Sequence, residues 1–320
     1  MITDYHAKLF AHELLRRHSV SDAEKMAGTL FDAQVDLNPH QVEAALFAFK
    51  SPLSKGAILA DEVGLGKTIE AGLVLSQKWT EGKRRILIVG PASLRKQWAQ
   101  EIEEKFFLPT FIIESRNYNK IIKSGGHRPF EQSAIVICSF QFAARYADEL
   151  MVTPWDLVVI DEAHRLRNVY RPDNKVGRAL KTAFGNVPKI LLTATPLQNS
   201  LMELYGLVSI IDEYAFGDAK SFRAQYARLS MDGQFEELKA RLKPVCHRTL
   251  RRQVLEYIRY TNRIPITQEF IPSAHEQQLY DHVSDYLSRP KLAALPSSQR
   301  TLMTLILRKL LASSTFAIAG

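Results

Sequence analysis

Residues 61–68 read DEVGLGKT and directly follow the short apolar run of residues 58–60. After them, residues 68–80 space their apolar side chains as an amphipathic helix does. A glycine-containing turn between a strand and a helix lets backbone N–H groups and the helix N-terminus face a bound anion. We therefore predict a phosphate-binding loop whose nucleotide contacts are Gly64, Leu65, Gly66, Lys67, Thr68 and Ile69.

Lys67 and Thr68 have the side chains in this loop that suit a triphosphate and its metal ion. The Lys67 ammonium is expected to reach the β- and γ-phosphates, and the Thr68 hydroxyl is expected to hold Mg²⁺. The general pattern has glycine where this sequence has Asp61, so the loop is a variant. A solvent-exposed turn is the alternative, which the strand before and the helix after disfavour. ATP and Mg²⁺ are the predicted ligands.

A second motif, Asp161-Glu162-Ala163-His164, follows the apolar run Leu157–Ile160. Asp161 is expected to hold Mg²⁺, and Glu162 is expected to orient and deprotonate the attacking water. Two acids after a strand are often only the solvated start of a helix, but the phosphate loop upstream favours catalysis. The predicted catalytic residues are Glu162, Asp161 and Lys67.

A third motif, Thr-Ala-Thr-Pro at residues 193–196, follows the apolar run Lys189–Leu192. Small hydroxyl side chains here are expected to hydrogen-bond His164 and to report the nucleotide state to a distant surface. Taken alone, the segment would be interpreted as a turn. His164, Thr193 and Thr195 are the predicted coupling residues.

Six short runs that are apolar on both faces predict the strands of a parallel sheet. They are residues 58–60, 85–89, 110–113, 135–138, 157–160 and 189–192. Helical stretches at residues 68–80, 93–105 and 141–150 fall between several of them. The fold class is therefore α/β, a doubly wound parallel sheet, in which ligands bind beyond the carboxyl ends of the strands.

The pattern along the chain predicts three parts. Residues 1–36 have the spacing of one or two amphipathic N-terminal helices, and residues 37–216 contain the predicted sheet. Residues 217–320 are interpreted as a mainly helical extension, apart from an extended piece around residues 264–271.

Composition and charge restrict the class of partner and the compartment. The 42 basic residues against 34 acidic ones give a net charge of +8, which favours an anionic partner such as nucleic acid. An ordinary solvated basic surface is the alternative. Cys138 and Cys246 have no metal-ligand spacing and are interpreted as reduced thiols of a cytoplasmic protein. No apolar run is long enough to cross a bilayer, so no membrane partner is expected.

Taken together, these motifs resemble those of superfamily-two helicases with a DEAH box, and specifically the Swi/Snf (Snf-two) family. The family's first motif begins with Asp-Glu, as Asp61 and Glu62 do here, and residues 193–199 resemble its Thr-Gly-Thr-Pro-x-Gln-Asn segment with Ala194 in place of glycine. The resemblance implies a RecA-like P-loop domain over residues 37–216, in which Gln41 recognises adenine. It also implies that the segments at residues 86–98 and 135–141 contact the DNA backbone, and it extends to about Tyr280.

The resemblance implies the first lobe of an ATP-dependent double-stranded DNA translocase. The sequence around Val63 and residues 70–72 is similar to that of bacterial members, which include the ATPase that recycles RNA polymerase and proteins of phage-defence operons. An RNA-polymerase-associated or RNA-directed motor is one alternative, and a nucleotide-binding interaction module without turnover is another. Because nothing after Tyr280 resembles the family's second lobe, the 320 residues alone are expected to be nearly inactive.

Several residues near these motifs are left with open interpretations. Two adjacent arginines are usual in the family after the helical segment; here the matching residues are 247–249, with Arg251 and Arg252 just beyond, and none is assigned a role. Arg95, Lys96 and Arg145 are either phosphate contacts or ordinary surface charges. Trp79, Trp98 and Trp155 are expected to be packing residues.

Overall fold

The computed structural model describes residues 37–50, 55–126, 128–226, 232–258, 266, 273–289, 304–307 and 309. The N-terminal helices predicted for residues 1–36, and all but one residue of the extended piece predicted around residues 264–271, lie outside these ranges. The chain divides into two compact units, Met1–Tyr260 and Thr261–Gly320, and each is described by itself.

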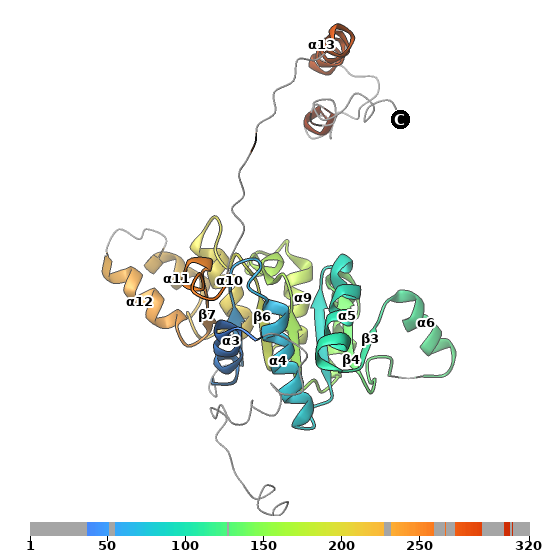
Figure 1. Cartoon of the computed structure of the whole chain (residues 1–320), viewed down its shortest axis with the longest axis vertical. Coiled ribbons are helices and arrows are strands. Elements are labelled where there is room, and N and C mark those ends of the chain that lie inside the picture. The colour runs from blue at the N-terminus through green and yellow to red at the C-terminus, as the bar shows by residue number, and fades with distance from the viewer. Residues whose placement is uncertain are drawn as a thin grey trace, which may run out of the picture. The chain divides into compact units, whose positions relative to one another are not determined.

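A seven-stranded sheet forms the centre of the first unit (Figure 1). Its order is β3-β4-β2-β5-β6-β1-β7, and every pair of neighbours is parallel. The strands are β1 (Gly56–Leu59), β2 (Ile86–Gly90), β3 (Thr110–Ile112), β4 (Ile135–Ser139), β5 (Leu157–Ile160), β6 (Lys189–Leu192) and β7 (Cys246–His247). Each of the six predicted runs is a strand, which confirms the predicted α/β fold with its parallel sheet.

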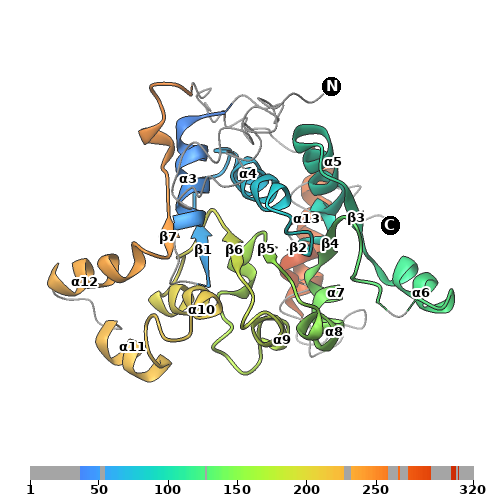
Figure 2. The ribbon, with the colours of Figure 1, turned by 90° about the horizontal axis from the view of Figure 1, so that it is seen from below.

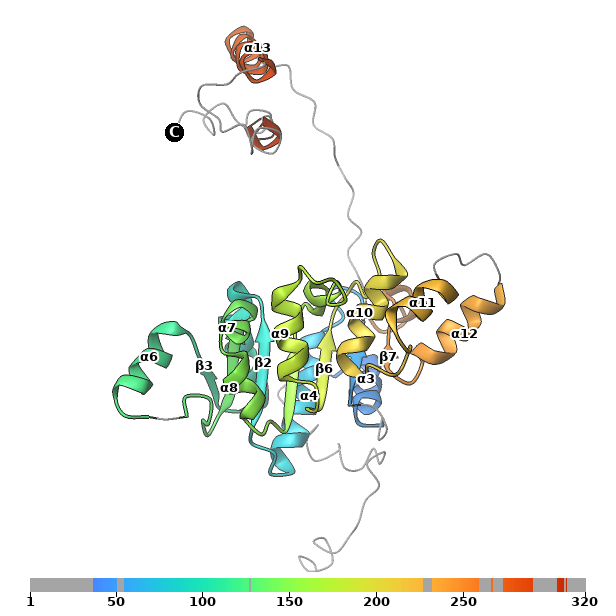
Figure 3. The ribbon, with the colours of Figure 1, turned by 180° about the vertical axis from the view of Figure 1, so that it is seen from behind.

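Two layers of helices cover the two faces of this sheet (Figure 2). One face packs against α3 (Pro39–Lys50), α4 (Lys67–Thr80) and α5 (Arg95–Phe106). The other, in front in Figure 3, packs against α7 (Phe140–Arg145), α8 (Ala147–Val152), α9 (Lys175–Ala183) and α10 (Leu201–Ile211). Successive strand residues alternate between the two cores, as Val158 and Val159 do, which explains why the strands are apolar on both faces.

Three further helices of the first unit lie toward the edges of the sheet. Helix α6 (Ser115–Lys123) follows the edge strand β3, and α11 (Ala219–Tyr226) and α12 (Asp232–Leu242) precede β7 (Figure 1). Phe222 of α11 and Leu238 of α12 are buried in the same core as α10.

The structure adds one strand that the sequence pattern did not indicate. Strand β7 is two residues long, and it pairs Cys246 with Ile58 and His247 with Leu59. A strand of two half-buried residues has no readable periodicity, and its partner lies almost the whole unit away in sequence. Residues beyond 216 therefore join the sheet directly beside the phosphate loop.

The second unit contains helix α13 (Ala274–Ser288) among its described residues. Ser273 begins this helix with a capping box, in which its hydroxyl accepts from the Glu276 N–H while the Glu276 carboxylate accepts from the Ser273 N–H. Across the described parts of both units, no helix combines the length and apolar character that a membrane span requires.

Candidate nucleotide-binding site

The predicted phosphate loop and the two other motifs meet at one edge of the sheet. Strands β5, β6 and β1 are consecutive neighbours and parallel, so their carboxyl ends lie side by side. Residues 161–164, 193–196 and 61–68 follow these three ends in that order. The topology therefore brings the predicted catalytic, coupling and phosphate-binding residues to the same place.

Two glycines give the predicted phosphate loop its tight backbone. Gly64 and Gly66 have φ angles of 85° and 92°, in the left-handed region that favours glycine. A side chain at Gly66 would also displace the Gln41 carboxamide from its present position. Helix α4 begins at Lys67 without a side-chain cap, and the Ile69 and Glu70 N–H groups donate to the Gly66 carbonyl at 2.7 and 3.1 Å.

Lys67 is held over the loop by the backbone of the loop itself. Its ammonium donates to the carbonyl oxygens of Asp61 at 2.8 Å and Glu62 at 3.3 Å. The positive charge of Lys67 thus lies against the carbonyl groups at the start of the loop. This position fits the predicted contact with the β- and γ-phosphates.

Gln41 touches the phosphate loop from helix α3. Its side-chain amide donates to the Leu65 carbonyl at 2.9 Å, and its side-chain oxygen accepts from the Asn38 N–H at 3.1 Å. The same Leu65 carbonyl lies 2.8 Å from Nε2 of His40. A glutamine has a second amide hydrogen and a second lone pair with which to read an adenine edge, so the predicted role of Gln41 stays compatible with its geometry.

Asp161 is held in place by two donors. Its Oδ1 accepts from the Glu162 N–H at 2.8 Å, and its Oδ2 accepts from Nε1 of Trp98 at 2.8 Å. Burial raises the pKa of Asp161, and the hydrogen bond from Trp98 opposes that rise. Thr68 and Asp161 both offer oxygen atoms, which are the ligands that Mg²⁺ prefers.

Trp98 has a role in this site that the sequence does not reveal. The sequence predicts a packing residue, and Trp98 is indeed buried, but its indole N–H is also a hydrogen-bond donor to the predicted metal ligand. The contact exists because α5 follows β2 and β2 is the neighbour of β5. Local sequence carries no signal for that neighbourhood.

Glu162 has a strained backbone at the position predicted to activate water. Its φ of 49° places a non-glycine residue in the left-handed region, which is uncommon outside functional sites. Oε2 of Glu162 lies 3.0 Å from Nδ1 of His164. The two side chains of the DEAH motif therefore approach each other next to the phosphate loop.

The hydrogen bond expected between His164 and the threonines of the third motif is not formed among the described residues. The Thr193 hydroxyl instead accepts from the Thr195 N–H at 3.2 Å. The two motifs are linked through Arg167, which donates to Oε1 of Gln198 at 2.6 Å and lies 3.5 Å from the Glu203 carboxylate. That carboxylate also accepts from the N–H groups of Gln198 and Asn199 at 3.1 Å each.

The second and third motifs are thus joined by Arg167 and Glu203, whereas the sequence predicts a hydrogen bond between His164 and the threonines. Burial would raise the pKa of Glu203, but the N–H donors of Asn199 and Gln198, with Arg167 beside them, lower it. Glu203 therefore stays charged and holds the third motif to the segment after the DEAH box. The coupling role of His164, Thr193 and Thr195 stays a prediction.

The two segments predicted to contact DNA lie next to each other because β2 and β4 are neighbours. An open pocket beside their carboxyl ends is lined by Arg95, Glu114, Ser115, Arg116, Ser139, Gln141, Phe142 and Arg145. Arg116 and Arg145 are exposed, while Arg95 lies 3.3 Å from the Glu114 carboxylate. Three arginines around one pocket suit a phosphate backbone.

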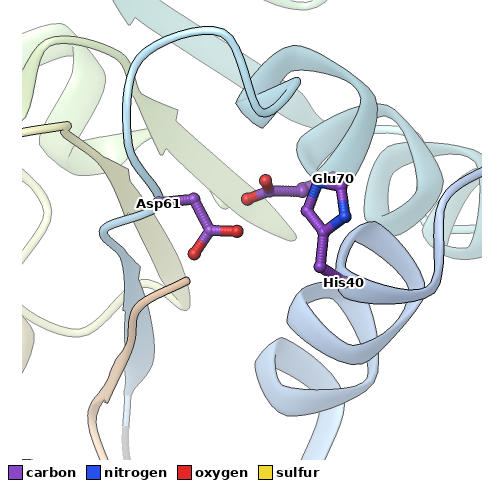
Figure 4. Close-up of side chains that lie close together, drawn as sticks. All are labelled: His40, Asp61 and Glu70. Carbon is purple, nitrogen blue, oxygen red and sulfur yellow. The ribbon is translucent and has the colours of Figure 1, made fainter. Parts of the chain in front are cut away.

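Three buried polar side chains, His40, Asp61 and Glu70, lie close together behind the phosphate loop (Figure 4). A metal ion does not fit them well, because Nε2 of His40 is engaged by the Leu65 carbonyl and Nδ1 lies 3.3 Å from the Tyr257 hydroxyl. Burial and the charge of Asp61 raise the pKa of Glu70 to about 9, which keeps it a neutral acid near neutral pH.

Asp61 stays ionised beside the neutral Glu70. Burial would raise the pKa of Asp61, but His247 and the N–H of Thr249 outweigh that effect and lower it. The pair is thus a carboxylic acid facing a carboxylate, with one negative charge between them.

A parallel sheet with a glycine-containing loop after β1 and an acidic pair after β5 is the arrangement of a RecA-like P-loop domain of the helicase type. Within that class, the chain belongs to the SNF2-related family, whose family model matches residues 24–315.

Curated relatives and solved structures agree with this assignment. The chain is 34% identical over 287 residues to an uncharacterized ATP-dependent helicase, YqhH of Bacillus subtilis, covering 87% of this chain and 48% of that protein. It is 36% identical over 217 residues to the RNA polymerase-associated protein RapA of Pectobacterium atrosepticum, covering 66% of this chain and 22% of that protein. The chain therefore spans half or less of these relatives.

The fold is also that of a solved SWI2/SNF2 ATPase core. The structure of the Sulfolobus solfataricus core in complex with double-stranded DNA matches with a TM-score of 0.60 at 22% identity, covering 90% of this chain and 61% of that chain. A structure of the core domain from the same organism matches with a TM-score of 0.58 at 21% identity. At this level of identity the likeness is one of fold.

Proposed function

We propose that this chain is the ATP-binding first lobe of an ATP-dependent double-stranded DNA translocase. The observation that carries the proposal is the single sheet edge on which a phosphate loop, an acidic pair and an arginine-lined pocket lie together. Nucleotide chemistry occupies the end near β1, β5 and β6, and a nucleic-acid backbone occupies the end near β2 and β4.

Each residue of the nucleotide end has a defined task in this proposal. Lys67 and the first N–H groups of α4 neutralise and orient the triphosphate, and Gln41 reads the base. Thr68 and Asp161 would hold Mg²⁺, which supplies charge neutralisation at the phosphates. Glu162 accepts the proton of the attacking water, and Trp98 keeps Asp161 in its orientation.

Contacts with nucleic acid in this lobe are proposed to be mostly with phosphates. The arginines at the pocket near β4 supply charge, and the sequence shows no base-reading motif. The relative whose solved structure contains double-stranded DNA has the same fold, which supports duplex DNA as the partner. Binding should then weaken with salt at a log–log slope of about −0.9 for each neutralised phosphate.

The test is steady-state phosphate release by the complete protein with duplex DNA, single-stranded DNA, RNA or no nucleic acid. The proposal expects duplex DNA to stimulate release the most. If only RNA stimulates phosphate release, the protein is an RNA-directed motor and the proposal of a DNA translocase is wrong.

An RNA-polymerase-associated motor is a second candidate, favoured by the 36% identity to RapA. It predicts that the complete protein binds RNA polymerase core enzyme and that this binding alters its ATP turnover. If the polymerase and the complete protein co-purify but ATP turnover does not change, and duplex DNA strongly stimulates turnover, the DNA translocase is the supported function. A role in phage defence and a cytoplasmic location stay predictions.

The 320 residues alone are proposed to bind nucleotide with negligible turnover, as an interaction module would. The support is that the chain spans 48% of its helicase relative. An arginine supplied across a cleft to the γ-phosphate is worth roughly 10³–10⁵ in rate, so a chain without one should be nearly inactive. Comparable phosphate release by this chain and by the complete protein would show that its site is complete.

A further inference from the structure

The segment of residues 245–251, which we name the strap, lies along the phosphate loop. The Ile58 and Ala60 N–H groups donate to the carbonyls of Val245 at 2.7 Å and His247 at 2.8 Å. The ladder then continues beyond β1 into the loop, where the Glu62 N–H donates to the Thr249 carbonyl at 3.1 Å. The strap therefore pairs with the loop itself, past the last residue of the strand.

Side chains reinforce this pairing at three consecutive loop residues. Asp61 accepts from the Thr249 N–H at 2.7 Å, and the Glu62 carboxylate accepts from the Arg251 N–H at 2.7 Å. The Arg251 guanidinium donates through Nε and Nη2 to the Val63 carbonyl at 2.9 and 2.6 Å. Arg251 also lies against Gly64, since a Cβ there would stand 3.3 Å from its Nη2.

These contacts account for the variant residue at the start of the loop. The general pattern has glycine at the position of Asp61. Here the Asp61 carboxylate is fully buried and directed at the strap, with the neutral Glu70 behind it (Figure 4). The Asp61 carboxylate thus contacts the strap, and Lys67 and the loop backbone remain the predicted phosphate-binding groups.

We propose that Asp61 and Arg251 are positioning residues that hold the phosphate loop in its nucleotide-binding conformation by docking the strap. Arg251 contacts the Val63 and Gly64 backbone, where the positive φ of Gly64 turns the chain of the predicted phosphate loop. Release of the strap would let residues 61–64 relax and would weaken nucleotide binding. Because coupling free energies are reciprocal, bound nucleotide must equally stabilise the docked strap. This inference rests on the proposed nucleotide site.

The decisive comparison is Arg251→Ala against Arg252→Ala in the full chain. Both arginines are exposed and adjacent, but within the described residues only Arg251 has a hydrogen bond to the phosphate loop. With a fluorescent ADP analogue as probe, Arg251→Ala should weaken binding about tenfold, within the range of ordinary coupling between sites. Arg252→Ala should bind like the wild-type chain.

A second pair of variants tests Asp61. Asp61→Gly restores the general loop residue, so the phosphate cradle is kept while the strap loses its acceptor. Asp61→Asn keeps an oxygen that can accept from Thr249 and should recover most of the binding lost in Asp61→Gly. Recovery by Asn argues for the hydrogen bond, whereas equal loss in both variants would argue against this role for Asp61.

Hydrogen exchange supplies a readout that a purely structural role would not move. The N–H groups of Glu62 and Thr249 should exchange more slowly when the ADP analogue is bound, and this protection should shrink in Arg251→Ala. Wild-type affinity in Arg251→Ala, with no effect of nucleotide on these two N–H groups, would overturn the inference. A Lys67→Ala chain that binds the analogue as tightly as the wild type would instead overturn the nucleotide site itself.

Discussion

The two ends of the sheet's functional edge are built differently. Around β1, β5 and β6 the polar groups are buried or tied down, as Asp61, Asp161 and Glu203 are by backbone and side-chain donors. Around β2 and β4 the arginines Arg116 and Arg145 are exposed. Chemistry on a phosphate needs atoms held in fixed positions, whereas attraction to a phosphate backbone needs charge with little geometry.

The largest effect is expected at the rigid end, from Glu162→Gln in the complete protein. Gln cannot accept the proton of the attacking water, so turnover should fall by about 10²–10⁴, the usual worth of a general base. Nucleotide affinity should stay within a few-fold of the wild type, because the phosphate contacts remain. Phosphate release and binding of a fluorescent nucleotide measure the two. Unchanged turnover would remove Glu162 from its proposed role.

Trp98→Phe tests whether the hydrogen bond from Trp98 is needed to hold Asp161, the predicted metal ligand, in its orientation. The ring stays buried, but the hydrogen bond to Asp161 disappears. Removal of such an outer partner of a metal ligand typically costs about 10–100-fold in activity or metal affinity. We therefore expect a higher Mg²⁺ concentration for half-maximal turnover, with a melting temperature close to that of the wild type. Trp79→Phe, on α4, is the matched control.

A decrease in stability without a change in Mg²⁺ dependence would mean that Trp98 only packs. In that case only the phosphate loop and the DEAH motif would need polar groups held in fixed positions, and the contact from Trp98 to Asp161 would not contribute.

These two predictions also mark how far the sequence could reach. The phosphate loop and the DEAH motif are each a continuous stretch of sequence whose residue types indicate their chemistry. The six predicted strands each have a local apolar pattern. The strap, the Trp98 bond and the Arg167–Glu203 link each join residues far apart in sequence. They depend on strand order, which places β7 beside β1, β2 beside β5 and β5 beside β6, and no local pattern encodes that order.

The exposed end is tested by the double change Arg95→Ala and Arg145→Ala. The salt dependence of duplex DNA binding should become shallower by about 0.9 in log–log slope for each phosphate that the variant no longer neutralises. Arg95 already lies 3.3 Å from Glu114, so Arg145 is expected to account for more of the change. Arg128→Ala is the control, because Arg128 is exposed and paired with Glu131 elsewhere on the first unit. An unchanged slope would show that DNA does not follow this pocket.

The smallest effect is expected at the opposite end of β6, where Lys189 is buried without belonging to any proposed site. Only 1% of Lys189 is exposed, and its ammonium donates a long hydrogen bond of 3.4 Å to the Gly185 carbonyl. Burial, with Lys55 nearby, lowers the pKa of Lys189 to about 8 from an ordinary 10.5.

The pKa difference of about 2.5 units corresponds to about 3.4 kcal/mol at about 1.4 kcal/mol per unit, and loss of the hydrogen bond to Gly185 offsets about 1 kcal/mol of it. Lys189→Met should therefore raise the free energy of unfolding near neutral pH by about 2 kcal/mol. Between pH 8 and 10.5 the unfolded lysine keeps a proton that the folded one has released, so the stability advantage of the variant over the wild type should shrink as pH rises through this range. Lys55→Met, at an exposed neighbour, should change stability by less than about 0.5 kcal/mol. Urea unfolding across this pH range measures both. If Lys189→Met is instead less stable than the wild type at neutral pH, the buried ammonium stabilises the fold. Buried charge would then have a structural role at this end of the sheet, in addition to the role proposed for it at the carboxyl ends of β1, β5 and β6.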